Sequence, residues 1–214
     1  MSGRFIESAH PQHSKGWHAD RLGRLTGSVV ADIFSKRKGE TEARDKLRFQ
    51  LALSRITGKP PAAQRVTADM KWGTAQEPFN RMVYEGQTGL DSRQCGFMYL
   101  PRLKAGCSVD GEVEDGGRHG FNEFKSPTSR VHYGYLEAGV LPADYVPQVT
   151  HNAWVTGYDF CDFQSFDPRL PKHLQVFRIR VERSALDIAG HERAVLQFLM
   201  EVDDLEDQMR RRAA

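Results

Sequence analysis

Two carboxylates and an amine fall close together near the middle of the sequence. Asp110 lies in the segment Ser108–Gly111, and Glu123 and Lys125 lie in the segment Phe121–Lys125. Side chains alternate faces along a strand, so Glu123 and Lys125 share a face if the second segment is a strand. If the two segments pair, Asp110 lies beside Glu123. Adjacent carboxylates repel each other unless a cation separates them, and a hard divalent ion prefers oxygen ligands.

This arrangement predicts the core of a magnesium-dependent phosphodiesterase. Asp110 and Glu123 would bind the metal, with the backbone carbonyl of Phe124 as a third oxygen ligand. Lys125 would hold the attacking water and offset the charge that builds on the phosphate. The alternative is a solvated hairpin with ordinary surface charges, because Glu-x-Lys alone is a common pattern. The preceding Ser-x-Asp-Gly turn and the following Ser-Pro favour the catalytic hypothesis.

Two further polar residues lie on predicted helices. Glu77 directly precedes Pro78 in a helix expected over residues 67–85, where the proline predicts a bend or a helix start. We expect Glu77 to point at the metal site, and Gln148, in a helix over 145–155, to bind the attacking or a metal-bound water. The alternatives are a surface carboxylate and a surface amide.

Basic residues near the N-terminus indicate a phosphate site. Arg21, Arg24 and Ser28 fall within a segment of two short predicted helices, where an arginine fork and helix-start amides can hold a phosphate. The alternative is a routine helix cap with two surface arginines. Lys36, Arg37 and Lys38 follow in a charged loop, which either touches a DNA backbone or is simply solvated.

Length and composition bound the remaining possibilities. The chain has 214 residues, a length that fits a single domain, which we expect over residues 15–214. We expect residues 1–14 to form a flexible arm before it. No run is long and apolar enough to span a membrane, and the first residues do not resemble a signal peptide. Three cysteines at no metal-like spacing indicate buried thiols in a reducing cytoplasm. A net charge of +2 means that DNA contact must come from local clusters.

Other catalytic motifs are missing from the sequence. The eight histidines form no His-Glu-x-x-His motif, and there is neither a Gly-x-Ser-x-Gly motif nor a phosphate loop ending in Gly-Lys-Ser/Thr.

The hydrophobic pattern predicts strands interspersed with helices. We expect strands over residues 95–100, 105–109, 121–125, 159–166 and 174–181, and a final helix over 184–209.

Several segments resemble the phage lambda exonuclease / YqaJ family of viral recombination nucleases, which belongs to the PD-(D/E)xK superfamily. The resemblance extends from about Gly16 to the last helix. Its anchors, in chain order, are GWHADRLGRLTGS, WGTAQEP, GCSVDG, FNEFKSPTSR, YVPQVTHNAWVTG and FQSFDPR. It implies an α/β fold with a central mixed β-sheet flanked by α-helices, the restriction-endonuclease-like core.

The resemblance also implies roles for matching residues. Asp110 and Glu123 match metal ligands, Lys125 matches the residue that acts on the nucleophilic water, and Glu77 and Gln148 match supporting positions. The pocket for the 5′-terminal phosphate of DNA matches Arg21, Ser28, Ser108 and Arg130. The segment after Lys125 is one residue shorter than in the family, and His151 stands where an aromatic residue is common.

The function implied is a Mg²⁺-dependent 5′→3′ exonuclease that degrades one strand of linear double-stranded DNA to mononucleotides and leaves a 3′ overhang. Mn²⁺ is an alternative cofactor. The resemblance further implies a homotrimeric ring, a single-strand annealing protein as partner, and the cytoplasm of a bacterial host, with a phage or prophage gene. Two alternatives stay open: a restriction or nicking endonuclease of the same superfamily, and a non-catalytic DNA-end-binding recombination scaffold.

Overall fold

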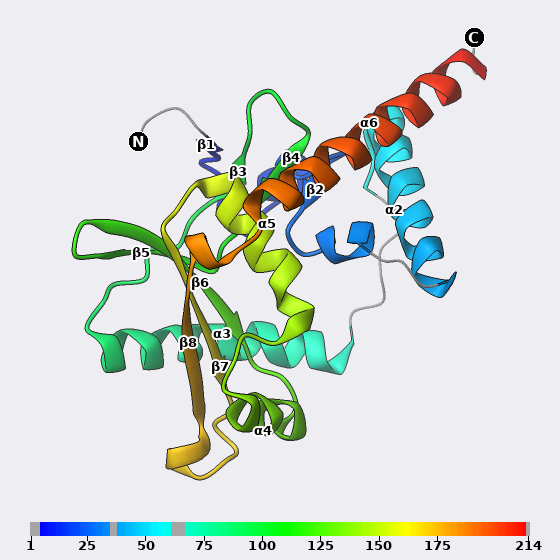
Figure 1. The fold of residues 1–214 in the computed structure, drawn as a ribbon. Helices are drawn as coiled ribbons and strands as arrows, with labels where there is room; N and C mark the ends of the chain where they lie inside the picture. The colour runs from blue at the N-terminus through cyan, green and yellow to red at the C-terminus, as the bar shows by residue number, and fades with distance from the viewer. Residues whose placement is uncertain (1–4, 35–37, 61–66, 213–214) are drawn as a thin grey trace.

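The computed structural model describes residues 5–34, 38–60 and 67–212, and it has the predicted α/β architecture (Figure 1). The helices are α1 (Lys15–Asp20), α2 (Lys38–Thr57), α3 (Ala68–Thr88), α4 (Ser129–Ala138), α5 (Val146–Thr156) and α6 (Ile188–Arg212). The strands are β1 (Ile6–Glu7), β2 (Leu25–Thr26), β3 (Met98–Tyr99), β4 (Ala105–Cys107), β5 (Gly111–Asp115), β6 (Arg118–Lys125), β7 (Phe160–Phe166) and β8 (Val176–Glu182). Short 3₁₀ helices cover Val30–Phe34, Ala143–Tyr145, Lys172–Leu174 and Arg183–Ala185.

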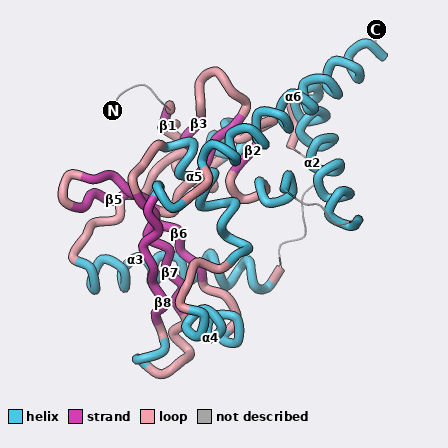
Figure 2. The backbone as a smooth tube through the Cα atoms, in the orientation of Figure 1, coloured by secondary structure: helices cyan, strands magenta, loops and turns pink. Residues whose placement is uncertain are grey.

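The larger sheet has the order β5-β6-β7-β8 and is mixed, because β6 and β7 are parallel while the other pairs are antiparallel. Every residue of β7 is buried, as expected for a central strand covered on both faces. Helix α3 packs against one face, where Tyr84 meets Phe124 with ring centroids 5.8 Å apart. Helices α4 and α5 pack on β7 as well, so β6 and β7 run between helices (Figure 2).

A second, smaller sheet, which the sequence did not predict, has the order β1-β3-β4-β2. Strand β2 is parallel to β4, and β3 is antiparallel to it. The chain passes directly from β4 through Ser108 and Asp110 into β5. The small sheet therefore fixes where β5 of the larger sheet begins.

The N-terminal segment differs from the expected flexible arm. Residues 1–4 lie outside the described residues, but β1 pairs with β3 and the Ser8 amide donates to the Phe97 carbonyl at 2.9 Å. The Gln12 side chain donates to the carbonyls of Cys95 and Val109 at 3.0 and 2.9 Å. Residues 5–14 thus form a strap held against the domain, which corrects the expectation for this part. Lys36 and Arg37, expected near DNA, also lie outside the described residues.

The predicted hairpin is present, but its first strand begins later than expected. We expected Ser108–Gly111 to close a strand, whereas β5 starts at Gly111 and the turn lies at Gly116 and Gly117. Both glycines have positive φ values, 59° and 78°, a conformation that suits tight hairpin turns. Asp110 therefore stands just before β5, at the rim of the sheet.

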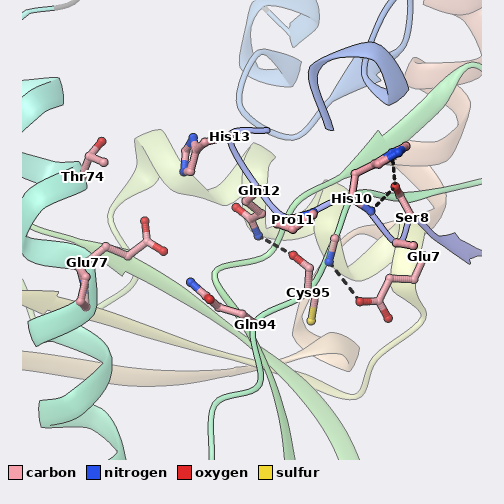
Figure 3. Close-up of a pocket in the computed structure, with 13 residues that line it drawn as sticks. Glu7, Ser8, His10, Pro11, Gln12, His13, Thr74, Glu77, Gln94 and Cys95 are labelled. Atoms are coloured by element: carbon pink, nitrogen blue, oxygen red, sulfur yellow. Dashed lines mark hydrogen bonds between the residues drawn. The ribbon is translucent and has the colours of Figure 1, made fainter. Parts of the chain in front are cut away.

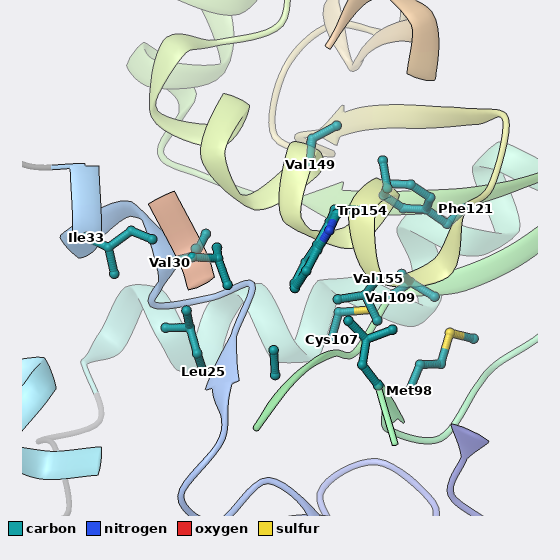
Figure 4. Close-up of a cluster of buried hydrophobic side chains, with 14 of the residues drawn as sticks. Leu25, Val30, Ile33, Met98, Cys107, Val109, Phe121, Val149, Trp154 and Val155 are labelled. Atoms are coloured by element: carbon teal, nitrogen blue, oxygen red, sulfur yellow. The ribbon is translucent and has the colours of Figure 1, made fainter. Parts of the chain in front are cut away.

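The main core joins the two sheets to α5 and α6 (Figure 4). Trp154 of α5 lies among apolar side chains from the strands and from the segment that follows β2. The last helix, expected over residues 184–209, contributes the buried side chains Val195, Phe198, Leu199 and Val202 to this core. All three cysteines, Cys95, Cys107 and Cys161, are buried free thiols, and burial raises the pKa of each. None of the described helices is long and apolar enough to cross a membrane.

Candidate active site

Asp110 and Glu123 lie opposite each other, as the strand pairing predicted. Gly111 pairs with Asn122, which places the preceding Asp110 beside Glu123. The Asp110 amide donates to the Asn122 carbonyl at 3.1 Å, and the Phe124 amide donates to Asp110 Oδ2 at 2.6 Å. These bonds fix both the backbone and the carboxylate of Asp110.

The same geometry bears on the Phe124 carbonyl. In an extended strand the N–H and C=O of one residue point to the same side. Because the Phe124 amide points at Asp110, its carbonyl also faces that side, beyond the start of β5. Three oxygen donors, from Asp110, Glu123 and Phe124, therefore border one region.

Glu123 is 1% exposed and accepts hydrogen bonds from three side chains. Lys125 Nζ and Gln148 Nε2 both donate to Oε1, the latter at 2.6 Å, and Asn152 Nδ2 donates to Oε2 at 3.2 Å. Gln148 and Asn152 are four residues apart on α5, so they lie on the same helix face. The structure brings Gln148 to the site as expected and adds Asn152, which its spacing from Gln148 could have revealed.

Glu77 reaches the same region from α3. Its carboxylate lies 3.6 Å from the Arg81 guanidinium, one helical turn further on. Arg81 also donates to the carbonyls of Ser92, at 2.8 Å, and Asp110, at 2.5 Å. It thus ties α3 to the backbone that carries Asp110. Arg81 is thus a further residue of the site, which the sequence analysis did not single out.

Burial dominates the electrostatics of the cluster. It raises the pKa of Glu123 to about 7 and that of Glu77 to about 6, and the Asp110 charge adds to both shifts. Burial likewise raises the pKa of Asp110 itself. Burial lowers the pKa of Lys125, but the charges of Glu123 and Asp110 outweigh this effect and leave its pKa raised. The raised pKa values of Glu77, Asp110 and Glu123 mean that Lys125 and Arg81 do not fully offset the charge of three ionised carboxylates, so a further cation would be stabilised here.

The donor set fits Mg²⁺. Within the described residues, no three His, Cys, Asp or Glu side chains converge into a closed metal cage. Mg²⁺ does not require one, since it keeps several waters and binds through one or two carboxylates. Asp110 and Glu123 supply those carboxylates, and the Phe124 carbonyl adds a neutral oxygen.

Two cavities meet at Glu77. One, of about 510 Å³, is lined by Glu77, Asp110, Phe124 and Lys125 together with Ser126–Thr128. The other, of about 530 Å³, is lined by the strap and by Thr74 and Glu77 of α3 (Figure 3). The acidic cluster, formed by Glu77, Asp110, Glu123 and Lys125, therefore borders the first cavity through three of its residues, and Glu77 also borders the second.

The predicted phosphate residues form a second cluster. Arg21 donates from Nη1 to Ser108 Oγ at 3.0 Å and from Nη2 to Ser28 Oγ at 3.3 Å. Its guanidinium lies 4.1 Å from the centroid of the Trp17 ring, and Trp17 Nε1 also donates to Ser108 Oγ, at 3.0 Å. Trp17, which the sequence analysis overlooked, lies one helical turn before Arg21.

Arg21 keeps its charge available for an anion. Burial lowers its pKa to about 10, which leaves it protonated at neutral pH. Its side chain has hydroxyl and ring partners and, within the described residues, no ion pair with a carboxylate. Ser108 belongs to this cluster and lies two residues before Asp110, so the phosphate cluster and the acidic cluster share one segment.

Two arginines lie apart from this cluster. Arg24 donates to the carbonyls of Asp20 and Leu103, at 3.0 and 3.3 Å, and its guanidinium packs on Tyr99. Arg130 is exposed in the first turn of α4, and the structure shows no contact between it and Arg21 or the serines in the part of the chain that is described. Its assignment to the phosphate pocket stays a prediction.

The family model of the YqaJ-like viral recombinase domain matches residues 16–159, a span that holds both clusters. The chain belongs to this family. The domain match includes Arg21, Asp110, Glu123, Lys125 and Gln148, so the resemblance found in the sequence is confirmed. A search of curated proteins found no match.

Solved structures agree with the family. The alkaline exonuclease LHK-Exo from Laribacter hongkongensis superposes with a TM-score of 0.83 at 33% identity, covering 94% of this chain and 98% of its own. A complex of LHK-Exo with dAMP matches with the same TM-score and coverage at 34% identity. A phage-related exonuclease from Haemophilus somnus shares the fold, with a TM-score of 0.61 at 13% identity, covering 89% of this chain and 96% of its own.

Proposed function

We propose that the chain is a Mg²⁺-dependent 5′→3′ exonuclease that degrades one strand of linear double-stranded DNA to mononucleotides. Membership of the recombinase family and the likeness to an alkaline exonuclease support a nuclease. The observation that carries the finer proposal is the connection through Ser108, which joins a cationic phosphate cluster to the acidic cluster two residues away. Such spacing suits an enzyme that measures from a 5′-terminal phosphate to the next phosphodiester bond.

Each residue of the acidic cluster has a distinct task in this proposal. Asp110, Glu123 and the Phe124 carbonyl hold Mg²⁺, which when bound lowers the pKa of water and neutralises charge on the phosphate. Lys125 holds the attacking water and stabilises the charge that develops in the transition state. Gln148 and Asn152 keep the Glu123 carboxylate oriented through their hydrogen bonds. Glu77 would be a third carboxylate, which accepts hydrogen bonds from waters around the metal.

The phosphate cluster would set the direction of digestion. A guanidinium between two hydroxyls is a favourable partner for a phosphate monoester, since charge-assisted hydrogen bonds are strong and directional. A DNA end with a 5′ phosphate would dock in one orientation, leaving the next phosphodiester at Asp110 and Glu123. The product would be a 5′-mononucleotide, and the structure of LHK-Exo with dAMP shows that relative with such a molecule.

The remaining strand would carry a 3′ overhang. Such an overhang is the substrate of a single-strand annealing protein, which we propose as the functional partner in recombination. This proposal rests on the family to which the chain belongs.

The deciding experiment uses duplexes labelled at either end, with a 5′ phosphate or a 5′ hydroxyl, in Mg²⁺ and in EDTA. We expect mononucleotides from the 5′ end, faster from phosphorylated ends, and no digestion in EDTA. Closed circular DNA is the control. Cleavage of circles would instead establish an endonuclease, and binding of ends without any digestion would establish a scaffold.

The variants Asp110→Ala and Lys125→Ala test the assignment of the acidic cluster. We expect each to lower the rate by at least about a hundredfold, the order of effect of removing one electrostatic contact to the transition state. Circular dichroism should show an unchanged fold. Undiminished digestion by either variant would contradict the assigned roles.

A further inference from the structure

His13 is unusual in its backbone conformation. It is the one residue other than glycine with a positive φ, 66°, in the described parts of the chain. The Ser14 amide donates to the Pro11 carbonyl at 3.2 Å, so His13 occupies the third position of a four-residue turn. Glycine or asparagine is usual where that position has a positive φ. A histidine there is strained, and strained residues of this kind cluster at functional sites.

The neighbours on both sides hold His13 in this conformation. Gln12 is anchored by its two hydrogen bonds to the carbonyls of Cys95 and Val109, and Ser14 caps α1 by accepting from the Trp17 amide at 3.2 Å. The imidazole itself stays exposed and has no hydrogen-bond partner among the described residues. The turn therefore presents an unpaired ring.

The ring lies near one member of each of the two clusters of the proposed enzyme. Its centroid is 5.3 Å from that of Trp17, the ring on which Arg21 packs. It also lines the 530 Å³ cavity together with Glu77, and Figure 3 shows the Glu77 carboxylate extending from α3 toward the side of the cavity where His13 lies.

We propose that His13 contacts the 5′-terminal nucleotide of the DNA, between the phosphate cluster and the metal site. This inference rests on the proposed exonuclease function. In the proposed complex, a nucleotide whose 5′ phosphate meets Arg21 and whose 3′ phosphate meets Asp110 would lie close to His13, because the His13 ring is next to Trp17 and shares a cavity wall with Glu77. The imidazole offers this nucleotide a hydrogen-bond donor and an aromatic face, and the strained turn holds it there in advance.

The test exploits the strain. His13→Gly removes the ring and suits the positive φ, so its Tm should equal or exceed that of the wild type. We expect kcat/KM on 5′-phosphorylated linear duplex to fall about tenfold, the order of one hydrogen bond to a charged group. His13→Asn tolerates the same backbone and keeps a donor, and it should retain more activity. His18→Ala is the matched control, because His18 also contacts Trp17 but does not line this cavity.

Binding of dAMP to the metal-free protein, measured by calorimetry, gives a second readout that needs no turnover. His13→Gly should weaken it about as much as it lowers kcat/KM, and His18→Ala should leave it unchanged. Wild-type values for His13→Gly, or losses that come with a lowered Tm, would overturn the inference. Failure of the wild type to digest linear duplex would refute the exonuclease function instead.

Discussion

Glu123 is the residue of the candidate site that combines the deepest burial with the most hydrogen-bond donors. Its carboxylate is almost fully buried, yet it accepts hydrogen bonds from Lys125, Gln148 and Asn152. A buried carboxylate with so many donors is arranged to remain ionised in the presence of a cation, while burial without that cation raises its pKa to about 7.

This shift predicts a pH dependence of metal binding. The pKa of Glu123 rises from an ordinary 4.5 to about 7 on folding, so the metal-free folded protein binds a proton more tightly than the unfolded chain between these values. Its contribution to stability therefore falls as pH rises through this window. Mg²⁺ competes with that proton, so its stabilising effect should grow with pH.

Thermal unfolding with and without Mg²⁺ measures the effect. At about 100 times the Kd and pH 8 we expect a Tm increase of about 5 to 10 °C, and less than half of that at pH 5.5. Asp110→Asn should abolish the increase at both pH values. An increase that is equal at both would show that Glu123 does not bind the ion.

Arg21→Lys tests the phosphate cluster at the same scale. Lysine keeps the charge but loses the planar fork that reaches both Ser28 and Ser108 and packs on Trp17. We expect digestion of 5′-phosphorylated ends to slow by about tenfold and digestion of 5′-hydroxyl ends to change little. Kinetics on the paired substrates measure this, and an equal loss on both would argue against a phosphate pocket.

Residues that act through local spacing could be predicted, and those that act through distant partners could not. The alternation of β6 placed Glu123 and Lys125 on one face, and the pairing placed Asp110 beside them. Trp17 and Arg81 gained significance only from contacts with Ser108 and the Asp110 carbonyl. These contacts depend on how a helix packs against a distant segment of the chain, and the spacing of residues within one segment does not determine that packing.

Among the elements, the N-terminal strap most depends on long-range contacts. At Gly96 an added Cβ would lie 2.0 Å from the Ser8 carbonyl oxygen and 3.3 Å from that of His10. Gly96, two residues before β3, is therefore a position where the strap passes too close for any side chain. The sequence analysis expected a flexible arm here because a strand of only two residues, such as β1, leaves no periodic pattern in the sequence.

Gly96→Ala should push the strap away from the small sheet. Overpacking against backbone costs about 1 to 3 kcal/mol, so we expect Tm to fall by several degrees, about 2 to 4 °C per kcal/mol for a chain of this size. Activity should fall too, since the strap lines the cavity at Glu77. A Tm equal to that of the wild type would contradict the tight docking.

Gly134→Ala in α4 is the matched control. An added Cβ there meets nothing within 4 Å, and alanine favours a helix over glycine. We expect a gain of about 0.5 to 1 kcal/mol in the free energy of unfolding and unchanged activity. Denaturant unfolding of both variants separates a specific steric effect from a general response to added methyl groups.

At the scale of the whole molecule, the order of the elements was predictable and the second sheet was not. Among the described elements, strands β6, β7 and β8 and helices α3, α5 and α6 overlap the segments expected from the sequence pattern. In the small sheet, β3 and β4 fall within the strands expected over residues 95–100 and 105–109, whereas β1 and β2 have two residues each and are defined by pairing with distant segments. The central mixed sheet was thus foreseen, while the small sheet that leads into Asp110 was not.

We also expect three copies of the chain to form a ring around DNA, as the family resemblance implies. A ring would retain the duplex between catalytic steps and make digestion processive. Light scattering coupled to gel filtration should give a mass three times that of one chain. A monomer at micromolar concentration that still digests thousands of nucleotides per encounter would contradict this explanation of processivity.

The burial of every cysteine has a practical consequence for such measurements. Thiols in this state react slowly with maleimides, because the reactive thiolate is scarce and shielded. One cysteine introduced on an exposed surface would then be the preferred attachment point for a fluorescent dye. The native cysteines would therefore not need to be replaced before a labelled enzyme is followed along DNA in single-molecule experiments.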